Sequence, residues 1–106
     1  MTATKTVISD TIAEGFHALS DPIRIQVLEL LRSQELRVCE MCQNLGITQS
    51  RLSFHLKTLK EVELVRTRQE GRSIYYSLNL PQFTVLEQYL MQTQGALESI
   101  HLTLKG

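Results

Sequence analysis

The clearest fold signal lies in residues 38–61, whose sequence is VCEMCQNLGITQSRLSFHLKTLKE. Apolar residues recur every three or four positions up to Gly46, a residue that can end a helix in the left-handed conformation. Thr48 can then cap a second helix at residues 49–61. The inward positions are Val38, Met41 and Leu45 in the first helix and Leu52, Leu56 and Leu59 in the second. A short helix at residues 38–45, a glycine corner and a second helix make a helix-turn-helix.

Two further helices are expected before this motif. Apolar spacing predicts one at residues 7–19, and Asp21 and Pro22 supply an N-cap and a first-turn proline for another that ends near Ser33. The apolar positions on their inner faces are Ile8, Ile12, Phe16, Leu19, Ile23, Val27, Leu30 and Leu31. Each of these helices therefore has one face to bury.

After the motif the pattern changes twice. Alternation at residues 64–78 predicts a β-hairpin, or wing, with Glu70-Gly71 as its turn, and residues 81–104 return to helical spacing. The apolar positions are Ile74, Tyr76 and Leu78 on one side of the returning strand and Phe83, Leu86, Leu90, Leu97, Ile100 and Leu104 on the last helix. The predicted fold class is mainly α with a β-hairpin (α+β), a winged helix-turn-helix in the order α-α-α-α-β-β-α.

Composition favours one intracellular domain. The chain has 106 residues and 42% hydrophobic content, enough for a single compact domain at residues 1–106 but not for a comfortable second one. Residues 1–9 lack the basic start and long apolar core of a secretory signal, and no apolar run approaches the roughly 20 residues that cross a bilayer. We therefore expect a cytoplasmic protein that does not contact membranes and keeps its cysteines reduced.

The net charge is zero, but the charges are unevenly distributed. Residues 1–47 contain four basic and six acidic side chains, residues 48–76 contain six and three, and residues 77–106 contain one and two. The excess of positive charge thus coincides with the second helix of the motif and the wing. A phosphate-binding face needs such a concentration, although a solvated helix and hairpin can also show it.

The second helix of a helix-turn-helix is the element that enters the major groove of DNA. With its leucines inward, its other side chains project outward, and three arginines lie on or beside the wing. The candidate DNA-binding residues are Gln49, Ser50, Arg51, Ser53, Phe54, Lys57, Arg66, Arg68 and Arg72. Each has a simpler role as an exposed helix or strand-edge residue, and Phe54 can instead pack beneath the wing. His55 lies beside the apolar stripe and is interpreted as a packing residue rather than a metal ligand.

The first and last helices are predicted to form a dimer. A monomer of this size has little surface to cover the stripes at residues 7–19 and 81–104, so we expect each helix to pair with its copy across a two-fold axis. The alternative is that the last helix folds onto its own core. A homodimer presents two recognition helices roughly 34 to 36 Å apart, which calls for an inverted-repeat operator in double-stranded DNA.

Cys39 and Cys42 are the only cysteines, and a helix brings side chains three positions apart to the same side. Two thiolates so placed can bind one soft or borderline ion, such as zinc, copper(I), cadmium, lead, or trivalent arsenic or antimony. Their position early in a helix helps to stabilise the thiolate form. The simpler interpretation is that Cys42, beside Val38 and Leu45, is a small buried hydrophobic residue. The spacing alone leaves both interpretations open.

The sequence resembles the ArsR/SmtB family of metal-responsive repressors over nearly the whole chain. The stretches that carry the resemblance are ALSDPIR at residues 18–24, LSFHLKTL at 52–59, and EGR at 70–72 followed by Tyr75 and Tyr76. In addition, ELRVCEMC at residues 35–42 is similar to the family's arsenic-sensor sequence ELCVCDLC, in which three cysteines bind arsenite or antimonite. The resemblance implies an inducer, As(III), Sb(III) or another thiophilic metal, with Cys39 and Cys42 as its metal ligands.

Three features depart from the family pattern. Arg37 stands where the first cysteine is expected, so a third ligand would come from hydroxide or a small thiol. The family's other site, on the last helix, lacks its carboxylates and histidines, and Glu98 and His101 remain as a weaker alternative pair. The residues at that site are Leu80, Gln82, Thr93 and Ala96. Glu63 replaces the glycine that is usual before the wing.

The resulting hypothesis is a transcriptional repressor that needs no cofactor to bind DNA and leaves its operator when a thiophilic metal binds to Cys39 and Cys42. The genes it would control, judging from the family, encode arsenic resistance. The same fold can instead sense redox state through a disulfide or persulfide at the pair, or act as a protein-interaction module without DNA. A thiol-disulfide enzyme would need a βαβ unit that the pattern lacks, so we expect no enzyme and assign no catalytic residue.

Overall fold

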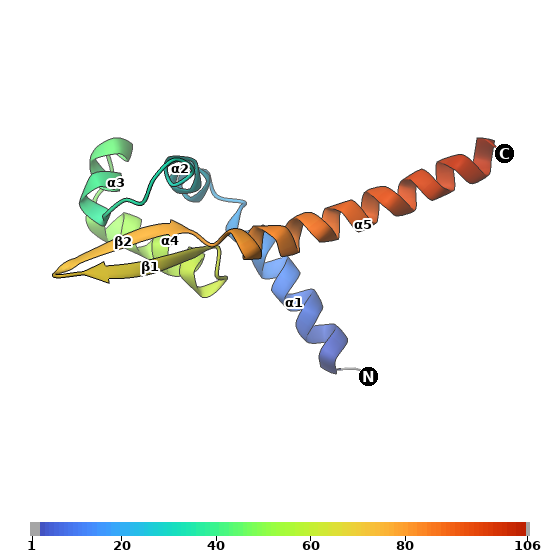
Figure 1. Ribbon diagram of the computed structural model, residues 1–106, viewed down its shortest axis with the longest axis horizontal. Coiled ribbons are helices and arrows are strands. Elements are labelled where there is room, and N and C mark those ends of the chain that lie inside the picture. Colours follow the sequence, from blue (N-terminus) through green and yellow to red (C-terminus); the bar gives the residue numbers. More distant parts are fainter. Residues whose placement is uncertain (1–2, 106) are drawn as a thin grey trace.

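The computed structural model describes the backbone of residues 3–105 and the side chains of residues 10–96. The elements in chain order are α1 (Ala3–Ala18), α2 (Pro22–Leu30), α3 (Val38–Leu45), α4 (Gln49–Glu61), β1 (Val65–Glu70), β2 (Ser73–Leu78) and α5 (Leu80–Lys105). Helices α2, α3 and α4 gather with the hairpin at one end, whereas α1 and α5 diverge from it (Figure 1). The predicted winged helix-turn-helix and its element order are confirmed.

Capping residues determine where the helices of the motif begin and end. Asp21 accepts hydrogen bonds from the backbone N–H groups of Ile23 and Arg24, at 2.8 and 3.2 Å, at the start of α2. Gly46 ends α3 with a left-handed φ of 66°, and its N–H donates to the carbonyl of Cys42 at 2.8 Å. Thr48 caps α4 by accepting from the N–H of Arg51. The bounds of α3 and α4 therefore agree with the sequence prediction.

The bounds of the other helices differ by a few residues. Helix α2 ends at Leu30 rather than near Ser33, because the chain then tightens and the N–H of Arg32 donates to the carbonyl of Glu29, three residues earlier. Helix α1 begins at residue 3 rather than 7, and α5 covers residues 80–105 rather than 81–104. Nothing in the sequence breaks either helix at the expected ends, so the backbone continues.

The core lies between the motif, α2 and the base of the wing. It contains the inward leucines of α4 and the predicted Met41 of α3, and it extends to α1 and α5 at their ends nearest the motif. Its buried apolar residues are Ala18, Val27, Leu28, Leu31, Leu36, Met41, Leu52, Leu56, Leu59, Leu64, Val65 and Leu86. Burial on both helices of the motif fixes the orientation of α4 relative to the rest of the domain.

The hairpin is antiparallel and is joined by a two-residue turn. Glu70 pairs with Ser73, so the turn consists of Gly71 and Arg72 rather than the expected Glu70-Gly71. Gly71 has a φ of 61°, and a positive φ at the first turn position matches the twist of the two strands. Ile74 lies on the same face as Tyr76, as predicted, but is 47% exposed because it lies near the tip of the hairpin, beyond the core.

A third segment pairs with the wing. The N–H of Leu36 donates to the carbonyl of Tyr76 at 3.1 Å, and the N–H of Tyr76 donates back to Leu36 at 2.8 Å. Leu36 lies in the connection between α2 and α3, and its side chain is buried. The connection before α3 is thereby hydrogen-bonded directly to the middle of β2.

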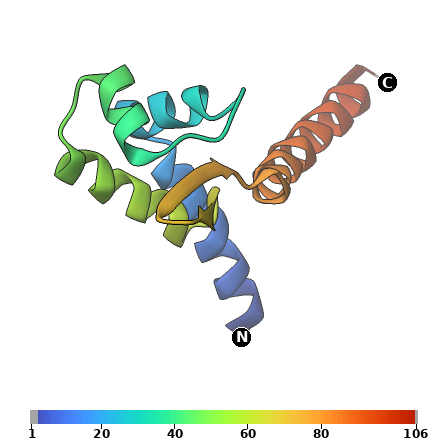
Figure 2. The same cartoon turned by 60° about the vertical axis from the view of Figure 1, so that its left-hand side comes forward.

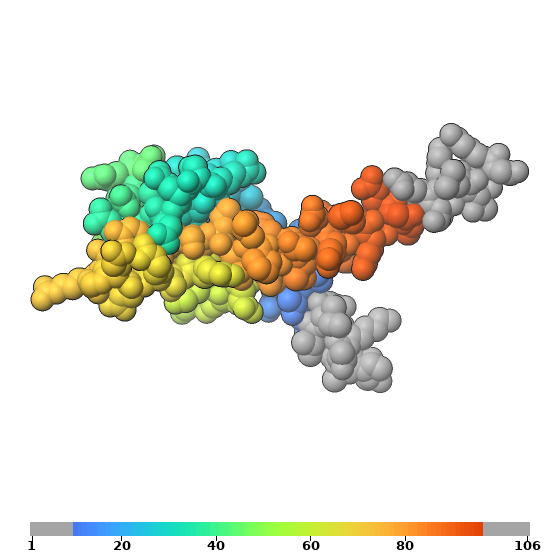
Figure 3. Space-filling model, viewed as in Figure 1, coloured from blue at the N-terminus to red at the C-terminus, as the bar shows by residue number. Residues whose placement is uncertain are grey.

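Helix α1 crosses α5 closely and then leaves it. A Cβ at Gly15 would lie 2.8 Å from a methyl group of Leu86, so the glycine permits this approach, and the rings of Phe16 and Tyr89 are 5.9 Å apart. Beyond the crossing, α5 extends away from the domain, and residues 87–96 are exposed (Figures 2 and 3). The predicted apolar positions Ile8, Leu97, Ile100 and Leu104 lie outside the described side chains. Among the described helices, none is both long and apolar enough to cross a membrane.

Glu63 connects α4 to β1 with a φ of 63°, the left-handed conformation that favours glycine. Two hydrogen bonds support this corner: the side chain of Asn79 donates to the carbonyl of Glu63 at 2.7 Å, and the N–H of Leu64 donates to Leu59 at 3.0 Å. A left-handed φ at this position explains why the family pattern has a glycine before the wing. In this chain Glu63 occupies the position instead and adopts a strained backbone conformation.

Candidate nucleic-acid interface and thiol pair

Helix α4 has one buried and one exposed face. Its buried residues are Leu52, His55, Leu56 and Leu59. All six predicted contact residues of this helix are exposed: Gln49, Ser50, Arg51, Ser53, Phe54 and Lys57. The structure therefore places them together on the surface opposite the core, as a helix that enters a groove requires.

Phe54 is 65% exposed and does not pack beneath the wing. Its ring lies edge-on to His55, with the centroids 5.4 Å apart. Of the two roles considered for Phe54, packing beneath the wing or exposure on the outer face of α4, the structure favours exposure. A large apolar side chain on an otherwise polar face is suited to contact a thymine methyl group.

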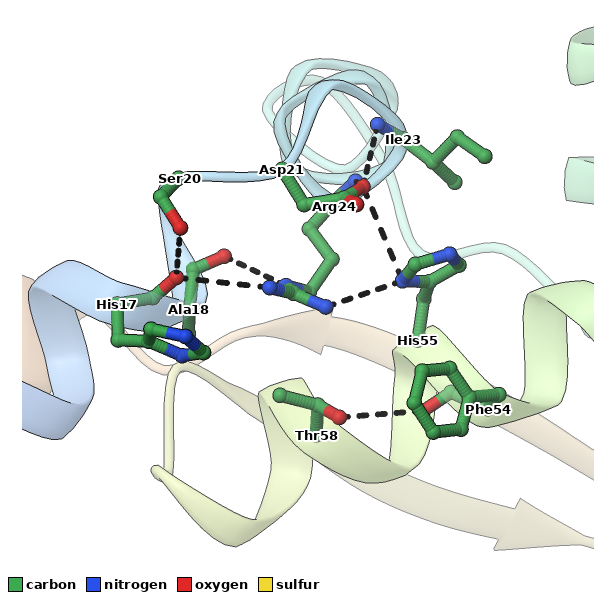
Figure 4. Close-up of polar contacts among 9 residues, drawn as sticks. All are labelled: His17, Ala18, Ser20, Asp21, Ile23, Arg24, Phe54, His55 and Thr58. Carbon is green, nitrogen blue, oxygen red and sulfur yellow. Dashed lines mark hydrogen bonds and ion pairs between the residues drawn. The ribbon is translucent and has the colours of Figure 1, made fainter.

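His55 is a buried packing residue, as expected, and its polar partner is Arg24. Both residues are 7% exposed, and Nη1 of Arg24 lies 3.2 Å from Nδ1 of His55 (Figure 4). Because a guanidinium can only donate, Nδ1 accepts, and the remaining proton of a neutral ring is on Nε2. Nε of Arg24 also donates to the carbonyl of Ala18 at 2.7 Å. Arg24 thus joins the end of α1, α2 and α4 from inside.

Asp21 completes this network from the start of α2. One of its carboxylate oxygens lies 3.8 Å from Nδ1 of His55. Partial desolvation opposes ionisation, but hydrogen bonds from the backbone N–H groups of Arg24 and Ile23 lower the pKa of Asp21 below its ordinary value. The carboxylate therefore balances the buried guanidinium while it caps the helix.

The three arginines of the wing have different surroundings. Arg66 donates a hydrogen bond to the side chain of Asn79 at the base of the hairpin. Arg72 is exposed in the turn. Arg68 contacts two carboxylates and lies over the ring of Tyr75, 4.8 Å from its centroid. The cationic groups are thus present on the wing, but only Arg72 is placed at its tip.

The contacts of Arg68 link the wing to the connection before α3. Its Nε and Nη2 atoms donate to the two carboxylate oxygens of Glu35 at 3.1 and 2.6 Å, and Nη1 donates to Glu70 at 2.5 Å. These hydrogen bonds raise the pKa of Arg68, and the bond from Arg68 lowers the pKa of Glu35. All three side chains are partly or largely solvated. Without DNA, the charge of the Arg68 guanidinium is thus neutralised by the carboxylates of Glu35 and Glu70.

The thiol pair lies in the first five residues of α3. Cys39 is exposed, whereas Cys42 is half-buried and packs against the core. Cys42 therefore has some of the character of a small buried hydrophobic residue, the simpler interpretation of its sequence position. Arg37 precedes the helix, and its N–H donates to the carboxylate of Glu40 at 2.8 Å. This backbone hydrogen bond is the main cause of the lowered pKa of Glu40. Arg37, which stands in place of a third cysteine, thus helps to close the first turn of the helix.

No group of three or more histidine, cysteine, aspartate or glutamate side chains is arranged to hold a metal ion within the described part of the chain. The alternative pair Glu98 and His101 lies outside the described side chains.

Comparison with known proteins agrees with this architecture. The model of the bacterial regulatory protein arsR family matches residues 21–67, from the cap of α2 into β1. The arsenical resistance operon repressor of Bacillus subtilis (strain 168) is 34% identical over 80 residues, which cover 74% of this chain and 76% of that protein. The chain belongs to the ArsR family.

Two further relatives show the extent of the similarity. The transcriptional repressor SmtB homolog of Synechocystis sp. (strain ATCC 27184 / PCC 6803 / Kazusa) is 40% identical over 67 residues, or 63% of this chain, and this ArsR-family chain matches about half of its length, 51%. The NMR structure of the homodimeric winged helix-turn-helix DNA-binding domain of Mb0332 from Mycobacterium bovis has a TM-score of 0.74 at 26% identity and covers 93% of both chains. The ArsR family consists of regulatory proteins rather than enzymes, and the described sheet is a two-stranded antiparallel hairpin without a βαβ unit.

The sequence did not identify several residues that position this ArsR-family site. Arg24 lay within a stretch that carried the resemblance, but nothing in the periodicity showed that it would be buried against His55. The partnership of Glu35 with Arg68 spans 33 positions, and local spacing contains no signal for it. Asn79 supports both Glu63 and Arg66 from a position between the predicted wing, residues 64–78, and the predicted last helix, residues 81–104.

Proposed function

We propose that this chain is a DNA-binding transcriptional repressor that places α4 in the major groove of its operator. The observation that carries the proposal is the exposed outer face of α4, which is backed by a fully buried inner face. Arg51 and Gln49, near the start of the helix, have the chemistry for bidentate contacts with guanine and adenine, and Phe54 for a thymine methyl group. The matched relatives are named as repressors, which supports the same conclusion. DNA binding requires no cofactor.

The wing is proposed to contact the DNA backbone or the adjacent minor groove. Arg72, exposed in the turn, is the best placed of the three wing arginines. Arg66 and Arg68 would first have to exchange their contacts with Asn79 and with the carboxylates for contacts with phosphate. Their contribution to affinity should therefore be smaller than that of Arg72.

The repressor is proposed to act as a homodimer through α1 and α5 on an inverted-repeat operator. In the described part of α5, several large apolar side chains are exposed, both before and after Leu86, which packs against α1. They are Leu80, Val85, Tyr89, Leu90 and Met91, with exposed fractions of 39–64%. Exposed apolar side chains in such number on one helix favour burial against a second copy. The homodimeric Mb0332 domain provides a structural precedent.

The inducer is proposed to be arsenite, antimonite or another thiophilic ion bound to Cys39 and Cys42. With arsenite, As(OH)₃ would form two As–S bonds, two thiol protons would leave with two hydroxides as water, and one hydroxide would remain as third ligand. The oxidation state of arsenic does not change in this exchange. Support comes from the exposure of Cys39, the helical spacing of the pair and the similarity to an arsenical resistance operon repressor.

Binding to a labelled fragment of the chain's own upstream region tests this function. The wild type should bind this fragment more tightly than it binds random duplex, and arsenite should release it. The variant with Cys39→Ser and Cys42→Ser should bind equally well and ignore arsenite. If wild-type protein shows no preference over random duplex, the repressor assignment is wrong. If the serine variant still responds, the inducer site lies elsewhere.

A redox response of the same pair is the second candidate. It is favoured by the lack of a third protein donor among the described residues, because a disulfide needs two sulfurs only. Mass spectrometry after mild peroxide treatment distinguishes the two. Loss of two mass units together with operator release, in protein that does not respond to arsenite, would favour the redox switch.

A further inference from the structure

We propose that Glu35 and Arg68 are positioning residues that transmit ligand binding at Cys39 and Cys42 to the wing. The inference rests on the proposed function, because it describes how the inducer site would be coupled to the DNA-binding surface. It is carried by one short segment, residues 35–37. Glu35 contacts the side chain of Arg68 on β1, Leu36 pairs with the backbone of β2, and Arg37 contacts the first turn of α3.

At the wing, Glu35 holds Arg68 through two parallel hydrogen bonds, at 2.6 and 3.1 Å. A bidentate pair of this kind fixes the relative orientation of the two groups, as well as their distance. Arg68 also lies over the ring of Tyr75, with its guanidinium carbon 4.8 Å from the ring centroid. The outer face of the hairpin is thereby attached to the segment that precedes α3.

In the middle of the segment, Leu36 exchanges two backbone hydrogen bonds with Tyr76 of β2. The side chain of Leu36 is 6% exposed and belongs to the core. Leu36 acts as a pivot, since its backbone and side chain are both held, while the residues on either side are exposed or half-buried. A displacement on one side of this residue can be passed to the other side.

At the helix, Arg37 is the N-cap residue of α3 and directly precedes its first turn. Its backbone N–H is bonded to Glu40, so it moves with the turn that carries Cys39. Only Val38 separates Arg37 from Cys39 in the chain. The thiol pair and the wing are thus connected through contacts that are continuous over these few residues.

Ligand binding should displace the Cys39 end of this connection. Cys42 is held against the core, whereas Cys39 is exposed at the start of the helix. When one arsenic atom bonds to both sulfurs, the less constrained residue must adjust most, and the first turn of α3 moves with it. The segment at residues 35–37 would then shift, and Glu35 would change its hold on Arg68.

Phenylarsine oxide is a suitable probe, since its arsenic carries one phenyl group and bonds to two thiols. Two As–S bonds form, the two thiol protons leave with the oxide oxygen as water, and no oxidation state changes. The coupling is measured as the ratio of operator Kd values with and without the probe, and such ratios are typically about 5- to 150-fold. Glu35→Gln should reduce this ratio about two- to five-fold, while protein without the probe still binds its operator.

Glu70→Gln is the matched control. Glu70 bonds the same guanidinium but belongs to β1, so its loss leaves the wing attached to the segment before α3. Both variants remove one exposed carboxylate, so they change the net charge equally. The ratio should stay at the wild-type value in the control. Equal losses in the two variants, or no loss in either, would overturn the inference.

A second measurement needs no DNA. The Nε–H resonance of Arg68 in the ¹⁵N NMR spectrum of free protein should shift when phenylarsine oxide binds, and should not shift in the variant with both cysteines replaced by serine. An unmoved resonance in the wild type overturns the coupling. A shifted resonance in protein that fails to bind or to leave DNA supports the coupling and contradicts the proposed repressor function.

Discussion

Helix α4 and the wing face the same proposed partner but are held in different ways. Four residues of α4 are buried, and one of them, His55, contacts a buried arginine from α2. The wing is buried at its base, through Leu64 and Val65, whereas its outer half is exposed and is attached by the ion pair between Arg68 and Glu35. Interior packing fixes one element, and surface electrostatics fixes the outer part of the other.

This difference predicts how each element responds to conditions. Contacts between buried side chains depend little on ionic strength, whereas salt screens pairs of exposed charges. The orientation of the recognition helix should therefore change little with salt concentration, while that of the wing should be adjustable. A regulator benefits from this division, because a weakly held element can be moved by a small coupling energy.

The largest expected effect comes from the packing beneath α4. Leu52→Ala removes a fully buried side chain from the inner face and should lower the free energy of unfolding by about 2 to 5 kcal/mol, as measured by urea denaturation. Ser53→Ala, one position along and exposed, should change it by less than about 0.5 kcal/mol. Comparable losses in the two variants would show that the core does not hold this helix.

The next effect tests the polar contact inside the domain. Arg24→Ala leaves the carbonyl of Ala18 and Nδ1 of His55 without their donor, and should cost about 1 to 3 kcal/mol in the free energy of unfolding. The matched control is Arg32→Ala, an exposed arginine whose pair with Glu29 lies on the surface. Thermal or urea unfolding of both proteins measures the difference. A loss no larger than that of the control would mean that the buried network contributes no stability.

The contrast between the two elements also separates what the sequence could and could not predict. The bounds of α3 and α4 were predictable because Gly46 and Thr48 act on their immediate neighbours, and the leucine spacing identified the buried face of α4. The start of α1, expected at residue 7 but observed at residue 3, was less well predicted, because the apolar spacing that located this helix begins only at Ile8. The turn of the hairpin was misplaced by one residue, since Gly71 is compatible with more than one register.

At the site, local chemistry was predictable and long-range contacts were not. The exposed face of α4 and the shared helix of Cys39 and Cys42 follow from helical periodicity. The pairing of Arg68 with Glu35 does not, because it depends on how the connection before α3 lies against β2. Which bases α4 would contact and which ion the cysteines would bind depend on partners, and the sequence of this chain does not contain them.

A smaller effect is expected where α4 joins the wing. Glu63 adopts a left-handed φ of 63°, so Glu63→Gly should remove backbone strain and raise the free energy of unfolding by up to about 1 kcal/mol, even though glycine adds entropy to the unfolded chain. The hydrogen bond from Asn79 is kept, since it is accepted by the backbone carbonyl. In contrast, Glu61→Gly, inside the last turn of α4, should be destabilising. Urea denaturation measures both, and a loss of stability in Glu63→Gly would indicate that the side chain has a stabilising role.

The smallest effect belongs to the exposed pair, and its dependence on conditions is more informative than its size. Because Arg68 lowers the pKa of Glu35 below its ordinary value of 4.5, the stability from this pair is present above that pH and is lost as the pH falls through the lowered value. Glu35→Gln should therefore be slightly less stable than the wild type at pH 7, and the two should converge at acidic pH.

Salt should have the same consequence, since raising the ionic strength from about 0.1 M to about 1 M shortens the screening length from about 10 Å to about 3 Å. The difference in free energy of unfolding between Glu35→Gln and the wild type should shrink over this range, while the cost of Leu52→Ala stays constant. If the cost of Glu35→Gln is as insensitive to salt and pH as that of Leu52→Ala, the wing is held by packing after all. The structural reason for expecting it to respond more readily than α4 would then be lost.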